Sequence, residues 1–286
     1  MSSVTTRIEN GQAGARAQKK IAVIGCGKMG SILLEAFLKR KLAEPDEVVA
    51  TVQHEEKSRS LSAELGGIAL GTDNRAAVAG APVVLLCVKP QALPQVLDEI
   101  ESSLAPGALV ISIAASTTVG FIQQKLGKDV AVVRAMPNTP AMVGAAMTAL
   151  CAGPSVRAEQ LETAKHLFEA VGRVAIVDEK HMDAITALSA SGPAFVFVIL
   201  ESLAEAGVKV GLPREMATTL AAQTLFGSAK LALETGHHPA LLKDAVTTPA
   251  GCTIEGLMEL ERGGLRVTLM NAVITTTKRA RELMTS

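Results

Sequence analysis

The segment from Ile21 to Lys41, IAVIGCGKMGSILLEAFLKRK, constrains the fold of this chain more than any other. An apolar run leads directly into Gly25-Cys26-Gly27-Lys28-Met29-Gly30, and an amphipathic helical pattern follows. In such a unit the first glycine permits the turn, the second lets the backbone approach a pyrophosphate, and the third lets the helix pack on the strand. We therefore predict a dinucleotide site formed by Ile24 and these loop residues, with a ligand-free glycine turn as the alternative.

Short apolar runs alternate with helical stretches from Lys20 to about Val177. We expect strands at IAVIG, EVVATV, PVVLLCV, ALVISIAA, VAVVRAM and GRVAIV, several of them buried on both faces of a parallel sheet. Helical stretches at 31–40, 90–104 and 156–171 separate some of these runs. The alternation predicts an α/β fold, with a Rossmann-type doubly wound sheet over residues 20–178.

The strand pattern ends at Asp178, and residues 179–286 are expected to form an all-helical dimerisation domain. The stretch 180–211 is apolar almost all round, so a helix there must be buried on every side. A domain this small lacks the chain to cover it, which predicts a homo-oligomer, with a helix sandwiched inside one chain as the alternative. Further helices are expected from Pro213 to Gly236, from Pro239, before Gly263 and up to about Met284.

The composition of the 286-residue chain argues against several functions. The formal net charge is zero and no basic stripe carries aromatic residues, so no nucleic-acid partner is expected. The four cysteines are scattered without metal-ligand spacing, and Tyr is absent as a general acid. No apolar run reaches the ~18 residues of a membrane span, and no secretory signal is present, so a cytoplasmic location is expected. Residues 1–19 are predicted to be a disordered tail, with a transit peptide as the alternative.

The residues after the second strand bear on which dinucleotide binds. An NAD site usually carries Asp or Glu about 20 residues past the glycine loop, but Gln53 stands near this place. His54, Lys57 and Arg59 follow and are suited to a 2′-phosphate, whereas Glu55 and Glu56 in the same turn are expected to face solvent. The sequence therefore favours NADPH, with NADH as the alternative.

Loops at the carboxyl ends of other strands should line the same crevice, because ligands of such sheets bind outside those ends. Several of these loops carry residues suited to a cofactor site. The further cofactor-binding residues predicted from them are Asn74, Val88, Lys89, Pro90, Ala114, Met136 and Asn138.

Several motifs, taken in chain order, carry a family resemblance: IGCGKMG, VVLLCVKPQ, VVRAMPNTPAMVG, ALSASGPAFVF and TTPAGCTIEGLMEL. From Lys20 to its C-terminus the chain resembles pyrroline-5-carboxylate reductases. The resemblance implies reduction of Δ1-pyrroline-5-carboxylate to L-proline with NADPH or NADH, the last step of proline biosynthesis. It also implies a homodimer that can assemble further, with the helical domain at the subunit interface.

The resemblance assigns substrate binding to Thr248, Ala250, Gly251, Cys252 and Thr253. Thr253 matches the family's contact to the substrate nitrogen and is the predicted catalytic residue, with an ordinary helix N-cap as the alternative role. Backbone N–H groups of 251–253 are expected to bind the carboxylate at a helix N-terminus, assisted by the Thr248 hydroxyl. Ala250 replaces a family glycine, which narrows the allowed backbone and puts substrate affinity in doubt.

The candidate loops fit the reduction of an imine better than that of a ketone. A ketone needs a proton donor for its alkoxide, but these loops contain no His or Tyr. A cyclic imine is activated once its nitrogen is protonated, so positioning can supply most of the rate. A β-hydroxyacid dehydrogenase would need a catalytic Lys that SASGPAFVFV lacks. A scaffold that binds NADP(H) without turnover would not need the substrate loop.

Overall fold

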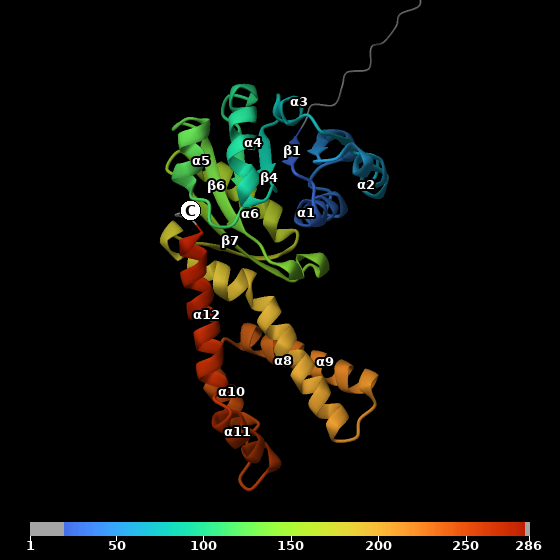
Figure 1. Cartoon of the computed structure of the whole chain (residues 1–286), viewed down its shortest axis with the longest axis vertical. Coiled ribbons are helices and arrows are strands. Elements are labelled where there is room, and N and C mark those ends of the chain that lie inside the picture. The colour runs from blue at the N-terminus through green and yellow to red at the C-terminus, as the bar shows by residue number, and fades with distance from the viewer. Residues whose placement is uncertain (1–19, 284–286) are drawn as a thin grey trace, which may run out of the picture.

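The computed structural model describes residues 20–283, so the predicted tail, residues 1–19, lies outside the described part of the chain. A sheet domain forms one end of the molecule and helical arms extend from it along the long axis (Figure 1). The strands are β1 (Ile21–Ile24), β2 (Val48–Thr51), β3 (Ala69–Gly71), β4 (Val83–Leu86), β5 (Leu109–Ser112), β6 (Ala131–Met136), β7 (Ala146–Ala152) and β8 (Gly172–Ile176).

The eight strands form one sheet in the order β3-β2-β1-β4-β5-β6-β7-β8. Strands β1 to β6 are parallel, β7 runs antiparallel to β6, and β8 runs parallel to β7. The chain reverses its direction of winding between β1 and β4, as in a doubly wound sheet. The predicted Rossmann-type domain is thus confirmed, although β3 and β7 were not predicted. β3 has three residues, and β7 (AMTALCA) contains a single β-branched residue.

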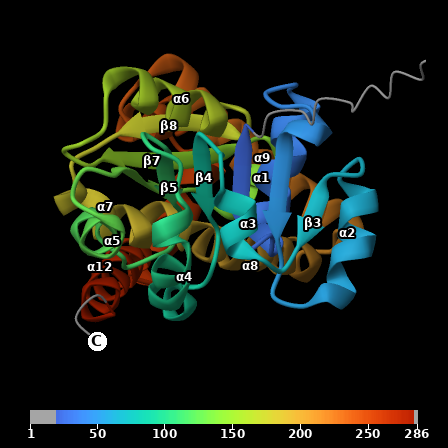
Figure 2. The same ribbon diagram turned by 90° about the horizontal axis from the view of Figure 1, so that it is seen from above.

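Helices cover both faces of the sheet (Figure 2). One hydrophobic core contains Phe37 and Phe168, and the other contains Leu97 and Ile122. The α-helices of this domain are α1 (Lys28–Lys39), α2 (Ser58–Glu64), α3 (Asn74–Val78), α4 (Leu93–Ile100), α5 (Val119–Leu126) and α6 (Ala158–Glu169). Its short 3₁₀ turns are η1 (Pro45–Glu47), η2 (Glu55–Lys57), η3 (Pro90–Ala92), η4 (Glu101–Ser103) and η5 (Thr139–Val143).

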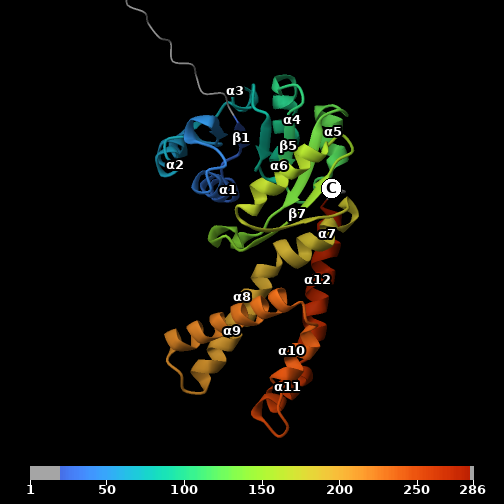
Figure 3. The same ribbon diagram turned by 180° about the vertical axis from the view of Figure 1, so that it is seen from behind.

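After β8 the described chain is helical to its end. Gly236 and Gly264, both at φ +66°, end α9 and separate α11 from α12, and α12 returns to the sheet domain (Figure 3). The predicted stop at Gly236 is confirmed. The elements are η6 (Glu179–His181), α7 (Met182–Ile185), a π-helical turn η7 (Thr186–Ala190), α8 (Gly192–Lys209), α9 (Arg214–Thr235), α10 (Pro239–Ala245), α11 (Cys252–Arg262) and α12 (Leu265–Glu282).

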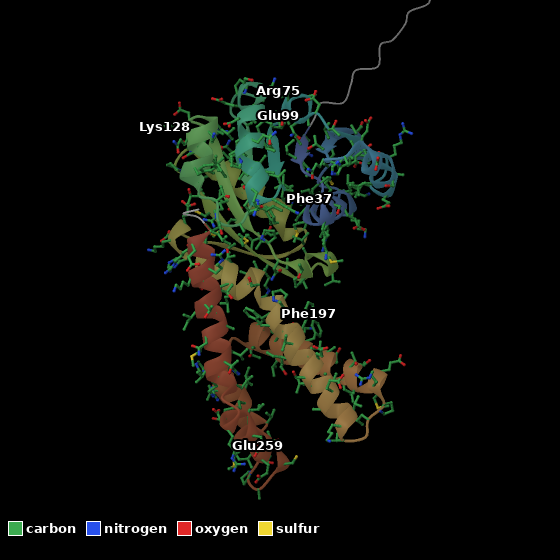
Figure 4. All side chains as sticks on the ribbon, in the orientation of Figure 1. Phe37, Arg75, Glu99, Lys128, Phe197 and Glu259 are labelled. Atoms are coloured by element: carbon green, nitrogen blue, oxygen red, sulfur yellow. The ribbon has the colours of Figure 1, made fainter. Side chains whose placement is uncertain are left out.

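Helices α8 and α9 leave large apolar side chains uncovered in the single chain. Phe197 on α8 and Phe226 on α9 are 62% and 60% exposed, and Figure 4 shows Phe197 on the helical arm, away from the sheet domain that holds Phe37. The alternative of a helix sandwiched inside one chain is therefore wrong. A second chain is the covering that the sequence predicted.

One described helical stretch, Glu179–Lys209, is long and apolar enough to cross a membrane by length and composition alone. The prediction made from the sequence concerned only uninterrupted apolar runs, whereas this stretch qualifies by its mean hydropathy over a window that tolerates charged residues. A single helix of this kind is weak evidence of a membrane span. A subunit interface requires the same apolar surface.

A buried arginine joins the two domains. Arg134, in the middle of β6, is 1% exposed, and its Nη1 lies 3.5 Å from Glu179 Oε1. Its Nη2 lies 3.8 Å from Asp183 Oδ1, beyond hydrogen-bond distance. Glu179 Oε1 also accepts the N–H of Val119 at 2.7 Å, in the first turn of α5. The start of the helical domain is thereby attached to β6 and α5.

Replacing this arginine should weaken the joint between the domains. In Arg134→Met the carboxylates of Glu179 and Asp183 lose their buried counter-charge, so the free energy of unfolding should fall by about 3 kcal/mol. The matched control is Arg279→Met, whose exposed pair with Glu282 contributes less than about 1 kcal/mol. Urea unfolding at fixed subunit concentration measures both, and an unchanged midpoint for Arg134→Met would contradict the role of this charge.

Candidate active site

The glycine loop is held in place by the three strands around it. Gly25 has φ +85°, and a Cβ there would lie 2.5 Å from Val88 Cγ1 in the loop after β4. The N–H of Gly25 donates to Thr51 Oγ1 at 3.1 Å, and the N–H of Cys26 donates to Thr51 O at 2.6 Å. A Cβ on Gly30 would lie 3.1 Å from Gly25 O, so only glycine lets α1 sit this close to β1. Sequence reasoning missed Thr51, although a hydroxyl at the end of a buried strand was a usable signal.

Gly27 has a different environment from the other two glycines. A Cβ at this position would meet no atom within 4 Å, so the space above it is open. Gly27 is also the N-cap of α1 and makes no side-chain cap hydrogen bond. The N-terminus of α1 therefore faces open space with a positive dipole end, which suits a pyrophosphate. Lys28 is exposed beside it, whereas Met29 packs against the core.

Two neighbouring loops lie against or beside this cradle. The N–H of Cys87 donates to Ile24 O at 2.8 Å, which places the loop of Val88, Lys89 and Pro90 next to the glycine loop. The N–H of Ile113 donates to Leu86 O at 3.1 Å, so the loop that carries Ala114 follows beside it. Met136 ends the next strand, β6, and lies in the same hydrophobic core as Ala114. The structure thus gathers these predicted residues at the carboxyl edge of the parallel strands.

Two predicted cofactor residues have their side-chain amides engaged elsewhere. Asn74 Nδ2 donates to Glu99 Oε2 at 2.9 Å. Glu99 lies in the last turn of α4, a helix that leads from the carboxyl end of β4 back towards the amino end of β5. Figure 4 shows Glu99 at the end of the sheet domain opposite the helical arms. The side-chain amide of Asn74 is thus engaged by Glu99. Asn138 accepts the N–H of Met147 at 3.0 Å and donates to Ser189 O at 3.1 Å, so it ties β7 to η7.

The groups near the cofactor cradle suit a polyanionic ligand. Gln53, His54 and Arg59 are exposed beyond the end of β2, where a 2′-phosphate would need cationic partners. Burial raises the pKa of the Cys26 thiol to about 11, and it raises the pKa of Cys87 as well. Both thiols therefore stay neutral near pH 7 and place no negative charge beside a pyrophosphate.

The segment between α10 and α11 forms a tight turn. Ala250 has φ +57°, in the left-handed region that glycine adopts at least cost. The N–H of Gly251 donates to Thr248 O at 3.1 Å, and a Cβ on Gly251 would lie 2.5 Å from Thr248 Oγ1. Gly251 is the N-cap of α11, without a side-chain cap hydrogen bond, and Thr253 lies in the first helical turn. The alternative role of Thr253 as N-cap is therefore wrong.

One chain does not bring the two halves of the predicted site together. Helix α11 lies at the far end of the helical arm, whereas α1 and the glycine loop lie in the sheet domain (Figures 1 and 3). Hydride transfer requires the reacting atoms to approach within about 3.5 Å. The substrate segment of one chain therefore cannot serve the cofactor cradle of the same chain in this arrangement.

The open space at Gly27 predicts a selective loss of cofactor affinity. In Gly27→Ala the new methyl meets no protein atom, so the melting temperature should stay within about 2 °C, but it enters the space of the pyrophosphate. The Kd for NADPH should rise about tenfold or more. Gly120→Ala, in α5, is the matched control because a Cβ there also meets nothing. Fluorescence titration and thermal melts measure the effects, and unchanged NADPH affinity in Gly27→Ala would place the pyrophosphate elsewhere.

Two family models match the chain. Residues 179–283 match the model described as pyrroline-5-carboxylate reductase dimerisation. Residues 20–116 match the model described as NADP oxidoreductase, coenzyme F420-dependent. The boundary between helical and sheet domains in the structure lies close to the start of the dimerisation match.

Curated relatives cover almost the whole chain. Pyrroline-5-carboxylate reductase of Methanosarcina acetivorans is 43% identical over 93% of this chain and 98% of that protein. The reductase of Arabidopsis thaliana is 40% identical over 93% and 96%, and that of Escherichia coli is 36% identical over 94% and 100%.

Solved structures agree with the sequence relatives. A pyrroline-5-carboxylate reductase from Coxiella burnetii has a TM-score of 0.86 at 36% identity and covers 93% of this chain and 98% of its own. The Plasmodium falciparum enzyme with NADP bound has a TM-score of 0.84 at 28% identity and covers 95% and 100%. With this agreement of sequence, fold and length, the chain belongs to the pyrroline-5-carboxylate reductase family.

Proposed function

We propose that this protein reduces Δ1-pyrroline-5-carboxylate to L-proline with a hydride from NADPH, the last step of proline biosynthesis. The observation that carries the proposal is that a chain of this family keeps both an open glycine cradle and Thr253 in the first turn of α11. The retained substrate segment favours an enzyme over a scaffold that binds NADP(H) without turnover.

Residues of the sheet domain hold the cofactor in this proposal. The cradle from Ile24 to Gly30 binds the pyrophosphate through backbone N–H groups and the N-terminus of α1. His54 and Arg59 are the exposed groups suited to the 2′-phosphate, which supports NADPH over NADH. When bound, NADPH supplies the hydride. Val88, Ala114 and Met136 shape the part of the crevice at the ends of β4, β5 and β6.

Residues at the start of α11 hold the imine. The N–H groups of Gly251, Cys252 and Thr253 bind the carboxylate at the positive end of the helix. The Thr253 hydroxyl hydrogen-bonds the ring nitrogen and keeps it oriented. This nitrogen is basic enough to take its proton from solvent, so Thr253 positions the acceptor and is not required to be an acid. Orientation alone can contribute several kcal/mol to the rate.

We infer that this substrate segment acts in the site of the partner subunit. The glycine cradle and α11 are far apart in one chain, and α8 and α9 expose an apolar surface that a second copy can cover. Further exposed apolar residues on the outer helices, such as Leu241 and Ile274, support an assembly of dimers. We assign the stretch 179–209 to the subunit interface, and a cytoplasmic location is in keeping with four free cysteines.

Substrate-dependent oxidation of NADPH tests the reaction. Purified protein should consume NADPH at 340 nm only after the five-membered imine is added, and NADH should support a lower kcat/KM. The six-membered imine run in parallel measures ring selectivity. Tight NADPH binding without turnover on the five-membered imine would instead support the scaffold.

Thr253→Ala tests the role of the hydroxyl. The value of kcat/KM for the imine should fall about tenfold or more, whereas the Kd for NADPH should not change. Thr163→Ala, which removes a hydroxyl from the exposed surface of α6, is the matched control. Equal activity of Thr253→Ala and wild type would remove this side chain from the mechanism.

Ala250→Gly tests the strain in the substrate turn. Because Ala250 has φ +57°, glycine should raise the free energy of unfolding by about 1 kcal/mol and leave the KM for the imine equal or lower. Lys41→Gly is the control, since Lys41 has φ +56° and follows α1, outside the substrate turn. It should gain similar stability without a change in KM. A several-fold rise of KM in Ala250→Gly would show that the methyl group assists binding.

A further inference from the structure

Helix α12 connects the substrate segment with the cofactor domain. It contains no glycine or proline, and its 18 residues span about 27 Å at 1.5 Å per residue. It begins at the turn after α11, and its other end packs against α7 and η7 beside the sheet domain (Figure 1). Without glycine or proline, α12 lacks the usual causes of a sharp kink, so we expect a change of angle at one end to move the other end as well.

The loop after β5 is tied to the last turn of this helix. Ser116 follows the predicted cofactor residue Ala114 by two positions, and its hydroxyl donates to Ala280 O at 3.1 Å. Ala280 is 5% exposed and belongs to the last turn, where carbonyl groups lack a partner within the helix. Ser116 has φ +54°, a conformation that glycine adopts at less cost. The hydroxyl gives a physical reason for serine at this strained position.

Three charged side chains in a row form a second connection between the last turn of α12 and the sheet domain. Arg281 Nε lies 4.0 Å from Asp183 Oδ2, and Asp183 Oδ1 faces Arg134 Nη2 at 3.8 Å. Arg134 precedes Met136 by two residues on β6. Asp183 is buried but Arg281 is exposed, and at 4.0 Å this pair is too long for a hydrogen bond, so it contributes less than a close ion pair would. The Ser116 hydrogen bond is the closer of the two attachments.

We propose that the last turn of α12 is a latch, with Ser116 as a positioning residue that holds the substrate-carrying arm in register for catalysis in the partner's site. This inference rests on the proposed function. If the latch is opened, α12 can tilt and displace Thr253 at the far end of the arm, and small misplacements of reacting groups are costly. A purely local role for Ser116 makes the opposite prediction, because a loosened loop at Ala114 would weaken NADPH binding.

The test separates these two roles by comparing Ser116→Ala and Ser116→Gly with wild type. The KM for the imine at saturating NADPH should rise about fivefold in both variants, the effect expected for one lost hydrogen bond. The Kd for NADPH without imine should stay within about twofold. Ser116→Gly also relieves the positive φ, so it keeps a folded comparison available if Ser116→Ala is unstable. Ser155→Ala, which removes a hydroxyl-to-carbonyl bond within the sheet domain, should change neither constant.

The other results would overturn the latch. A rise in the Kd for NADPH without a rise in KM, or an equal rise in both, would assign Ser116 to the cofactor loop alone. No change in either constant would leave the hydrogen bond without a role in positioning. Failure of the proposed function is distinguished by the wild-type protein alone, which would then bind NADPH but not turn over the imine.

Discussion

The apolar faces of α8 and α9 need a second chain, because side chains as large as Phe197 and Phe226 are more than half exposed in one copy. Burying a side chain of this size contributes about 2 kcal/mol, so a dimer gains much of its stability here. The same requirement determines the site. The start of α11 lies on a second arm of the same helical domain, formed by α10, α11 and α12. The association that buries the apolar faces of α8 and α9 can therefore also deliver Thr253 to another subunit's cofactor cradle.

The chemistry asks little of the side chains beyond placement. A cyclic iminium accepts a hydride without a protein acid, which agrees with a glycine cradle and a substrate turn that contain no His or Tyr. The structure instead fixes the positions of the loops and helix turns around the predicted site. Thr51 fixes the glycine loop, Asn138 ties β7 to η7, and Arg134 anchors the first turns of the helical domain. Each of these residues holds a loop or helix turn next to a predicted site residue or to the helical domain.

Much of this could be predicted from the sequence, and the limits have physical causes. The glycine loop, the fully buried strands and the stop at Gly236 could be predicted from local rules, because a positive φ favours glycine and a strand buried on both faces is continuously apolar. The sequence signals of β3 and β7 are weak, because β3 has only three residues and β7 is rich in alanine, which has a low propensity for strands. Arg134 reads as an ordinary charged residue until the fold buries it between domains. Asn74 was predicted from its place after a strand, but its partner Glu99 is 25 residues away.

Mixed dimers test most directly whether the site is shared between subunits. Gly27→Glu removes the cofactor cradle in one chain, and Thr253→Ala removes the substrate contact in the other. If the cradle of one chain works with the α11 segment of its partner, a mixed dimer contains one intact site. Co-expression should then restore about a quarter of wild-type activity, far above either variant alone. Activity no higher than the average of the two separate variants would show that each chain completes its own site.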